Sequence, residues 1–228
     1  MKKHIPNAIT CLNLFSGCLG IVFAFEGELE WASYSILVAA FFDFLDGMLA
    51  RVLNAYSDIG KDLDSLADVV SFGVLPSIII YHLFLESSSN SEWLKYSAFF
   101  IAIFSALRLA KFNNDIRQSE NFIGFPTPAN AMLIASLPFI AAGGNIVSSF
   151  LQNPVFLAVF SLGMGLLLIS EIHLMSLKFS GFDFKKNLHR YILVFSSLIL
   201  LLIFKFAAVP LIMVAYFTIS LIQFRTTK

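Results

Sequence analysis

The sequence has few charged residues for a chain of its length. Only 13% of its 228 residues are charged, while 58% are hydrophobic. Soluble domains carry about 25% charged residues, and a water-soluble domain of this size has too little interior to bury so much apolar surface. The scarcity of charge therefore excludes an ordinary soluble domain and predicts that most of the chain lies in a lipid bilayer.

Cysteine is also scarce, and the charges that are present cancel. The only cysteines are Cys11 and Cys18, which excludes a disulfide framework and the usual zinc-site spacing, and we expect both to be packing residues. The formal net charge is zero, so the composition gives no reason to expect a nucleic-acid partner. No repeat or low-complexity tract marks a second domain, so we expect residues 1–228 to form a single membrane domain.

Eight apolar runs each approach the length of a membrane span, which is about 20 residues. They cover roughly residues 8–25, 32–53, 61–85, 93–112, 128–147, 154–174, 190–206 and 207–224. This pattern predicts an all-α, polytopic integral membrane protein with about eight transmembrane helices. The last two runs are short and are divided near Pro210, which predicts a C-terminal helical hairpin at about 190–224. No small-residue cleavage site follows the first run, so we expect a retained helix and not a signal peptide.

The basic residues indicate how these spans are oriented. If the N-terminus is cytoplasmic and every run spans, all lysines and arginines except Lys95 and Lys205 fall on the cytoplasmic side. Membrane proteins carry such an excess of lysine and arginine in their cytoplasmic loops. The distribution therefore predicts cytoplasmic N- and C-termini and an even number of spans.

Four aspartates lie where the second and third predicted spans meet. An aspartate at the centre of a membrane helix costs about 2.5–3.5 kcal/mol on insertion scales, so four of them call for a function. Asp43 and Asp46 are three residues apart on one helix, and Asp64 and Asp68 are four apart on the next, so each pair shares a helix face. A turn near residues 54–59 makes these helices antiparallel neighbours, and their facing stripes predict one cluster of four carboxylates.

The residues around the aspartates suit a closely packed site. Gly47, Ala50 and Gly60 lie on the same stripes, and small residues let two membrane helices approach closely. Asp58 and Asp62 lie off the stripe, and we expect them to be solvated acids at the membrane surface.

Several kinds of chemistry fit four clustered carboxylates. Ionised carboxylates repel one another unless something neutralises them, and their hard oxygens suit Mg²⁺ or Mn²⁺. Two such cations would hold a pyrophosphate, with Arg51 beside the stripe to pair with a phosphate, and one aspartate could instead accept a proton from an alcohol. Buried acids also serve in cation transporters, so a transporter remains an alternative at this point.

These residues match a motif, D-x2-D-G-x2-A-R-x8-G-x3-D-x3-D, which is the signature of the CDP-alcohol phosphotransferases. Its fixed positions are Asp43, Asp46, Gly47, Ala50, Arg51, Gly60, Asp64 and Asp68. The chain also resembles the membrane-embedded bacterial phosphatidylserine synthases within this family. That similarity lies in residues 5–10, 13–17, 64–74, 107–113 and 124–129, although Lys111 stands where arginine is expected and Met48 where a basic residue is common.

The resemblance implies roles for the motif residues. Asp43, Asp46 and Asp64 would bind metal, with two divalent cations of Mg²⁺ or Mn²⁺ in the site. Asp68 would bind the second cation or act as the catalytic base. The residues expected to surround the nucleotide and the lipid phosphates are Gly47, Ala50, Arg51, Gly60, Asn7, Thr10 and Asn13, the last three as a polar edge of the first helix. Their alternative role is to cap that helix at the interface and to bond to neighbouring helices.

The resemblance also implies a reaction, with a catalytic core at about 5–175. The expected substrates are CDP-diacylglycerol and L-serine, and the products phosphatidylserine and CMP. Arg108, Lys111 and Asn113 are the expected acceptor-binding residues, since a carboxylate favours a cationic partner, although such basic residues also snorkel at membrane surfaces. The remaining expectations are a homodimer in a bacterial inner (cytoplasmic) membrane with the active site facing the cytoplasm. Glycerol phosphate and inositol remain alternative acceptors.

Overall fold

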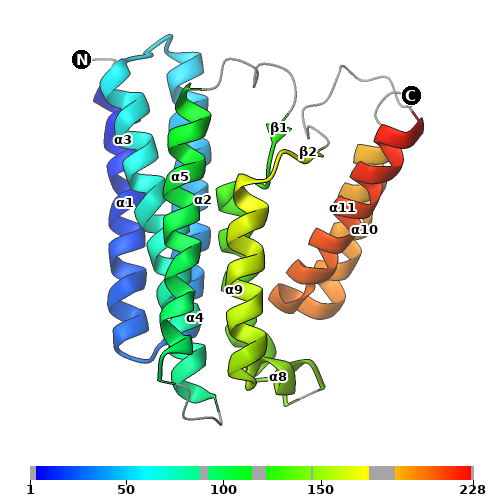
Figure 1. Cartoon of the computed structure of the whole chain (residues 1–228). Helices are drawn as coiled ribbons and strands as arrows, with labels where there is room; N and C mark the ends of the chain where they lie inside the picture. Colours follow the sequence, from blue (N-terminus) through cyan, green and yellow to red (C-terminus); the bar gives the residue numbers. More distant parts are fainter. Residues whose placement is uncertain (1–3, 88–91, 115–121, 145, 175–187, 227–228) are drawn as a thin grey trace.

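A computed structural model describes residues 4–87, 92–114, 122–144, 146–174 and 188–226, almost all of them helical (Figure 1). The elements are α1 (His4–Phe25), α2 (Leu29–Val52), α3 (Asp58–Asp68), the π-helical η1 (Val69–Val74), α4 (Leu75–Glu86), the 3₁₀ helix η2 (Leu94–Phe99), α5 (Phe100–Asn114), β1 (Phe122–Ile123), α6 (Thr127–Ala135), α7 (Leu137–Ala141), α8 (Ile146–Leu151), α9 (Pro154–Ile169), β2 (His173–Leu174), α10 (Leu188–Phe204), the 3₁₀ helix η3 (Lys205–Ala208) and α11 (Val209–Thr226). Of the basic residues used above to orient the spans, those outside the described residues are Lys2, Lys3, Arg117, Lys178, Lys185, Lys186 and Lys228; Arg225 is described in its backbone only.

The elements confirm the predicted class of helical membrane protein. Within the described ranges, three helical stretches are long and apolar enough to cross a bilayer: His4–Phe25, Asp58–Glu86 and Arg190–Ser220. Thr127–Ala141 and Pro154–Ile169 are shorter apolar helices. The helices run up and down side by side, and α1 begins at the same edge of the bundle at which α11 ends (Figure 1).

Two of the predicted helices differ in the structure. The run at 128–147 is shorter than predicted and is interrupted: the helical stretch ends at Ala141, and Ser136 separates α6 from α7, because Pro138 near the start of α7 has no N–H for a continuous helix. The run at 154–174 ends early, at Ile169, and β2 then pairs with β1 in a short antiparallel ladder. Hydrophobicity alone did not reveal this ladder, because both of its strands are only two residues long.

Helix α1 buries its small and polar residues and exposes its large apolar ones. The buried stripe is Pro6, Thr10, Asn13, Gly17, Gly20 and Ala24, whereas the exposed side chains include Leu12, Phe15 and Phe25. Membrane helices associate through small residues because lipid tails already solvate large apolar ones. Cys11 and Cys18 are exposed, so the expectation that they pack inside was wrong; both lie off the buried stripe.

The buried stripe of α2 leads directly to its two aspartates. Leu29, Ala32, Ile36 and Ala39 are buried at alternating spacings of three and four. Continuing this spacing reaches positions 43 and 46, so the face that is buried at one end of the helix presents carboxylates at the other. Burial of this stripe therefore orients the acids.

Gly17 sets how closely α1 approaches the π-helical segment η1. A Cβ at this position would lie 2.9 Å from the Cα of Ser71 and in closer contact still with its hydroxyl. We expect Gly17→Ala to lower the stability by about 1–3 kcal/mol, because backbone would have to shift. Thermal unfolding in detergent measures this. Gly163→Ala is the matched control, since no heavy atom lies within 4 Å of its added Cβ; equal melting temperatures for the two variants would contradict the prediction.

The last two long helices form a separate antiparallel pair beside the bundle (Figure 1). Helices α10 and α11 are joined through η3, where Lys205 has a positive φ of 51°. A small cluster of Phe125, Leu168, Leu193 and Tyr216 connects this pair to the remainder of the protein. Most of the pair is exposed, as only 11% of its apolar stretch is buried.

Candidate active site

Three carboxylates meet between α2 and the helix that follows it. Asp43 on α2 and Asp64 and Asp68 on α3 each offer an oxygen, and these oxygens lie within 4.8 Å of one another. Asp46 is buried on the same stripe of α2 and lies close enough to interact electrostatically with all three. The structure thus places the four predicted aspartates in one cluster.

The cluster has the chemistry of a site for a divalent cation. Asp46 Oδ2 and Asp64 Oδ1 are buried without a hydrogen-bond partner. A buried carboxylate oxygen is costly unless a donor or a cation compensates it. Several carboxylate oxygens converging on one point are the ligand set that Mg²⁺ and Mn²⁺ prefer, so the residues present fit such a group.

Asn13 contacts the cluster directly. Its Nδ2 donates a hydrogen bond of 3.2 Å to Asp68 Oδ1, and its backbone oxygen accepts one of 3.0 Å from Ser71 Oγ. Ser71 belongs to η1, and π-helical segments occur often at functional sites. Helix α1 therefore holds the Asp68 carboxylate in place, a contact that sequence spacing alone could not assign.

A pocket of about 200 Å³ opens beside the cluster. Seven of the predicted site residues line it: Asn7, Thr10, Asp46, Gly47, Ala50, Gly60 and Asp64. Asn13 is not in its lining, and neither is Arg51, whose exposed side chain donates from Nε to Gly47 O at 2.9 Å. The absence of a side chain at Gly60 keeps the pocket open, because a Cβ there would meet Asn7 Oδ1 and Ser57 Oγ at 3.0 Å each.

Five lining residues were missed by sequence reasoning: Pro6, Ala55, Tyr56, Ser57 and Lys61. Tyr56, Ser57 and Lys61 lie where α3 begins. Ser57 caps this helix by accepting a hydrogen bond of 3.1 Å from Gly60 N, a role for which serine is strongly preferred. The N-cap pattern was therefore a usable signal for Ser57, whereas nothing local marked Tyr56 or Lys61.

The three predicted acceptor residues lie in different surroundings. Arg108 is only 8% exposed, donates from Nη1 to Thr127 Oγ1 at 2.7 Å, and interacts electrostatically with Asp68. Asn113 donates to Ser65 Oγ at 2.7 Å, and its backbone oxygen accepts from Lys61 Nζ at 2.8 Å. Asn113 therefore connects α5 to α3, whereas Arg108 is bonded to α6 and lies close enough to Asp68 to interact with its charge.

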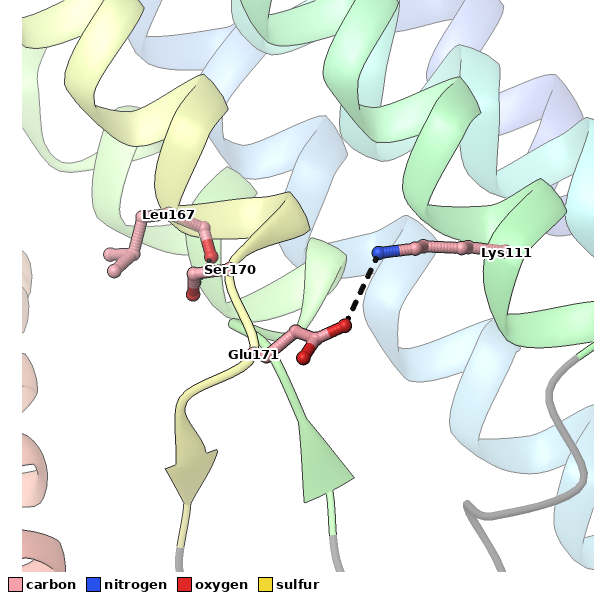
Figure 2. Close-up of polar contacts among 4 residues, drawn as sticks. All are labelled: Lys111, Leu167, Ser170 and Glu171. Atoms are coloured by element: carbon pink, nitrogen blue, oxygen red, sulfur yellow. Dashed lines mark hydrogen bonds and ion pairs between the residues drawn. The ribbon is translucent and has the colours of Figure 1, made fainter.

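Lys111 points elsewhere. Its Nζ lies 3.9 Å from Oε1 of Glu171, a residue just after the end of α9 (Figure 2). In the same segment, Ser170 Oγ donates a hydrogen bond to Leu167 O. Both side chains of the ion pair are more than half exposed, and an exposed pair contributes about 0–1 kcal/mol. Lys111 thus ties α5 to the segment after α9, away from the aspartates.

The fold and the site together define a class: a helical membrane protein whose clustered carboxylates fit a divalent cation next to a pocket. The sequence model of the CDP-alcohol phosphatidyltransferase family matches residues 3–176. The chain belongs to this family, as the motif predicted.

Named relatives are similar over most of their length. A CDP-diacylglycerol–serine O-phosphatidyltransferase from Bacillus subtilis is 36% identical over 170 residues, which cover 75% of this chain and 89% of the relative. One from Helicobacter pylori is 32% identical over 225 residues, covering 96% and 90%. One from Methanocaldococcus jannaschii is 35% identical over 169 residues, covering 74% and 72%.

Proposed function

We propose that this chain transfers the phosphatidyl group of CDP-diacylglycerol to the hydroxyl of L-serine, giving phosphatidylserine and CMP. The observation that carries the proposal is the meeting of four aspartates beside a pocket lined by the small residues of the family motif. The names of the relatives support serine as the acceptor.

We assign metal binding to Asp43, Asp46 and Asp64, with Asp68 contributing to a second cation or acting as the base. Two divalent cations, Mg²⁺ or Mn²⁺, would when bound draw negative charge off the phosphates of the lipid substrate. The unpartnered oxygens of Asp46 and Asp64 support this assignment.

In the proposed transfer, the serine hydroxyl oxygen forms a bond to the lipid-linked phosphorus, and the bond from that phosphorus to the CMP oxygen breaks. The hydroxyl proton passes to Asp68. Asn13 donates to Oδ1 of this carboxylate, so we assign Oδ2 as the proton acceptor. Positioning of the two reactants and electrostatic stabilisation supply most of the rate enhancement in transfers of this kind.

The pocket is the proposed nucleotide site. Gly47, Ala50 and Gly60 leave room for the cytidine nucleotide, and Asn7 and Thr10 offer polar groups from α1. Arg51 is assigned to a phosphate, since its exposed guanidinium lies at the same helix end. Asn13 is assigned here to Asp68 instead of to the nucleotide.

We further propose that the chain makes eight membrane crossings, with the pocket facing the cytoplasm. Among the described basic residues, Arg51 lies near the end of α2, Lys61 near the start of α3, and Arg108 and Lys111 in the second half of α5, whereas Lys95 lies in η2, before α5, and Lys205 in η3, between α10 and α11. Helix α3 begins at the edge of the bundle at which α5 ends (Figure 1). This asymmetry is that of the positive-inside rule. We propose that residues 5–175 form the catalytic core and that residues 190–224 form a C-terminal helical hairpin outside it. The proposed assembly is a homodimer in a bacterial inner membrane.

Release of CMP tests the proposal. Purified protein is mixed with CDP-diacylglycerol and Mg²⁺ or Mn²⁺, and CMP is measured with L-serine, glycerol 3-phosphate or inositol as acceptor. Of the three acceptors, we expect only serine to cause release of CMP. Release only with another acceptor would move the chain to a different branch of the family, and cation flux without CMP release would point to a transporter.

Arg108 is the proposed partner of the serine carboxylate. We expect Arg108→Lys to raise the KM for serine by about tenfold or more, because lysine keeps the charge but cannot bind a carboxylate through two parallel hydrogen bonds. Initial rates against serine concentration measure this, with Lys111→Arg as the control for a charge placed away from the site. An unchanged serine KM in Arg108→Lys would argue against carboxylate capture.

A further inference from the structure

Unsatisfied polar atoms occur both in the carboxylate cluster and on the helices α5 and α6. Among the described residues, eight buried side-chain nitrogen or oxygen atoms lack a hydrogen-bond partner: one each in Asn13, Asp46 and Asp64, four in Ser105, Arg108 and Asn130 of α5 and α6, and Ser33 Oγ. Buried polar groups are normally paired, so each exception needs an explanation. Asn130 stands out because both atoms of its amide, Nδ2 and Oδ1, are unpartnered and the residue is 0% exposed.

The position of Asn130 connects it to Arg108. Asn130 follows Thr127 by three residues on α6, so the two share a helix face. Thr127 Oγ1 accepts the 2.7 Å hydrogen bond from Arg108 Nη1, while Arg108 Nε has no partner. Helix α6 also packs against η1, the segment that begins directly after Asp68.

A neighbouring serine completes this unsatisfied surface. Ser105 lies three residues before Arg108 on the same face of α5, is 0% exposed, and has an unpartnered hydroxyl. A Cβ at Gly73 of η1 would lie 3.1 Å from Ser105 Cβ, so this face of α5 is packed closely on η1. The unpartnered atoms of Arg108, Asn130 and Ser105 therefore come from α5 and α6 around one segment.

We infer that Asn130 is an acceptor-binding residue that recognises the zwitterion of an amino acid, an inference that rests on the proposed function. An amide can donate from Nδ2 to a carboxylate and accept through Oδ1 from an ammonium. Serine carries both groups on one carbon, whereas glycerol phosphate and inositol carry no ammonium. With Arg108 as the cationic partner of the carboxylate, Asn130 supplies the contact that selects an amino acid.

The stability of the variants separates this role from a structural one. A polar group without a partner is costly to bury, and an apolar group of similar shape in its place is neutral or stabilising. We therefore expect Asn130→Leu to keep or raise the melting temperature while the KM for serine rises about tenfold or more, as expected for the loss of a hydrogen bond to a charged group. The KM for CDP-diacylglycerol should stay unchanged, since Asn130 does not line the nucleotide pocket.

Two further variants make the test decisive. Ser33→Ala is the matched control, because Ser33 is equally buried and unpartnered but lies near the other end of α2; its serine KM should equal that of the wild type. Asn130→Ala gives the same comparison with a smaller side chain if Asn130→Leu fails to fold. Ethanolamine and 3-hydroxypropanoate each lack one charged group of serine, and both are tested as competitors of serine. The ratio of the affinity for serine to the affinity for each analogue should be larger in the wild type than in the Asn130 variants.

The outcomes distinguish the two hypotheses. A wild-type protein that releases no CMP with serine refutes the proposed function itself. An active wild type with the same serine KM in Asn130→Leu or Asn130→Ala, or a fall in melting temperature with no change in KM, overturns the role of Asn130 and leaves the proposed function standing.

Discussion

Asp68→Asn is expected to reduce the rate of CMP release by about 100- to 10,000-fold, the usual contribution of a general base. Asparagine has nearly the same shape and can still accept the hydrogen bond from Asn13, so the fold should be retained. It cannot take up the proton of the serine hydroxyl. Initial rates measure the loss, and binding of the CDP-lipid should be unaffected.

The control for this variant lies on the same helix. Asp62 is exposed and lies off the carboxylate stripe, and Asp62→Asn removes the same charge from α3 without touching the cluster. We expect this variant to retain wild-type turnover. If Asp68→Asn also turned over like the wild type, Asp68 would not be the base.

Asp64→Asn is expected to have opposite effects on the protein with and without metal. Without metal, the change removes one of four carboxylates that repel one another, so the melting temperature should rise. With Mn²⁺, a wild-type site at 100 times its Kd gains about 2.7 kcal/mol of stability, and the variant should lose this gain together with its activity.

Metal titrations followed by thermal unfolding measure both effects. Changes in outer-shell partners of a metal weaken binding by about 10- to 100-fold, so loss of a direct ligand is expected to weaken Mn²⁺ binding by about 100-fold or more. Asp58→Asn, at an exposed acid in the first turn of α3, should behave like the wild type. Equal Mn²⁺ stabilisation in Asp64→Asn and Asp58→Asn would exclude Asp64 as a ligand.

Much of the carboxylate cluster could be predicted because helical periodicity is a local property. The spacing of Asp43 and Asp46, and of Asp64 and Asp68, determines which face of each helix they occupy. The turn between the helices is short, so the two faces had few ways to meet, and the structure places them together. The resemblance to the family, together with this spacing, identified seven of the residues that line the pocket.

The surroundings of Asp68 were less predictable, since they depend on helices distant in the sequence. Asn13 lies 55 residues from Asp68; it was expected either beside the nucleotide or in a bond to a neighbouring helix, and helical spacing could neither decide between these roles nor identify the partner. Nothing in the sequence around Lys111 indicated that it would pair with Glu171. The amide of Asn130 carried no motif that marked it.

The sequence by itself determined that this is a helical membrane protein, that the aspartates of each helix share a face, and to which family it belongs. These properties follow from hydrophobicity, helical period and a motif, all of which are readable within short stretches of chain. The tertiary structure alone decided that Arg108 and not Lys111 approaches Asp68, and that Asn130 is enclosed without a partner. The physical reason is that these contacts depend on the rotation and depth at which α5 and α6 pack against η1, and packing between distant helices is not encoded in the spacing of either one.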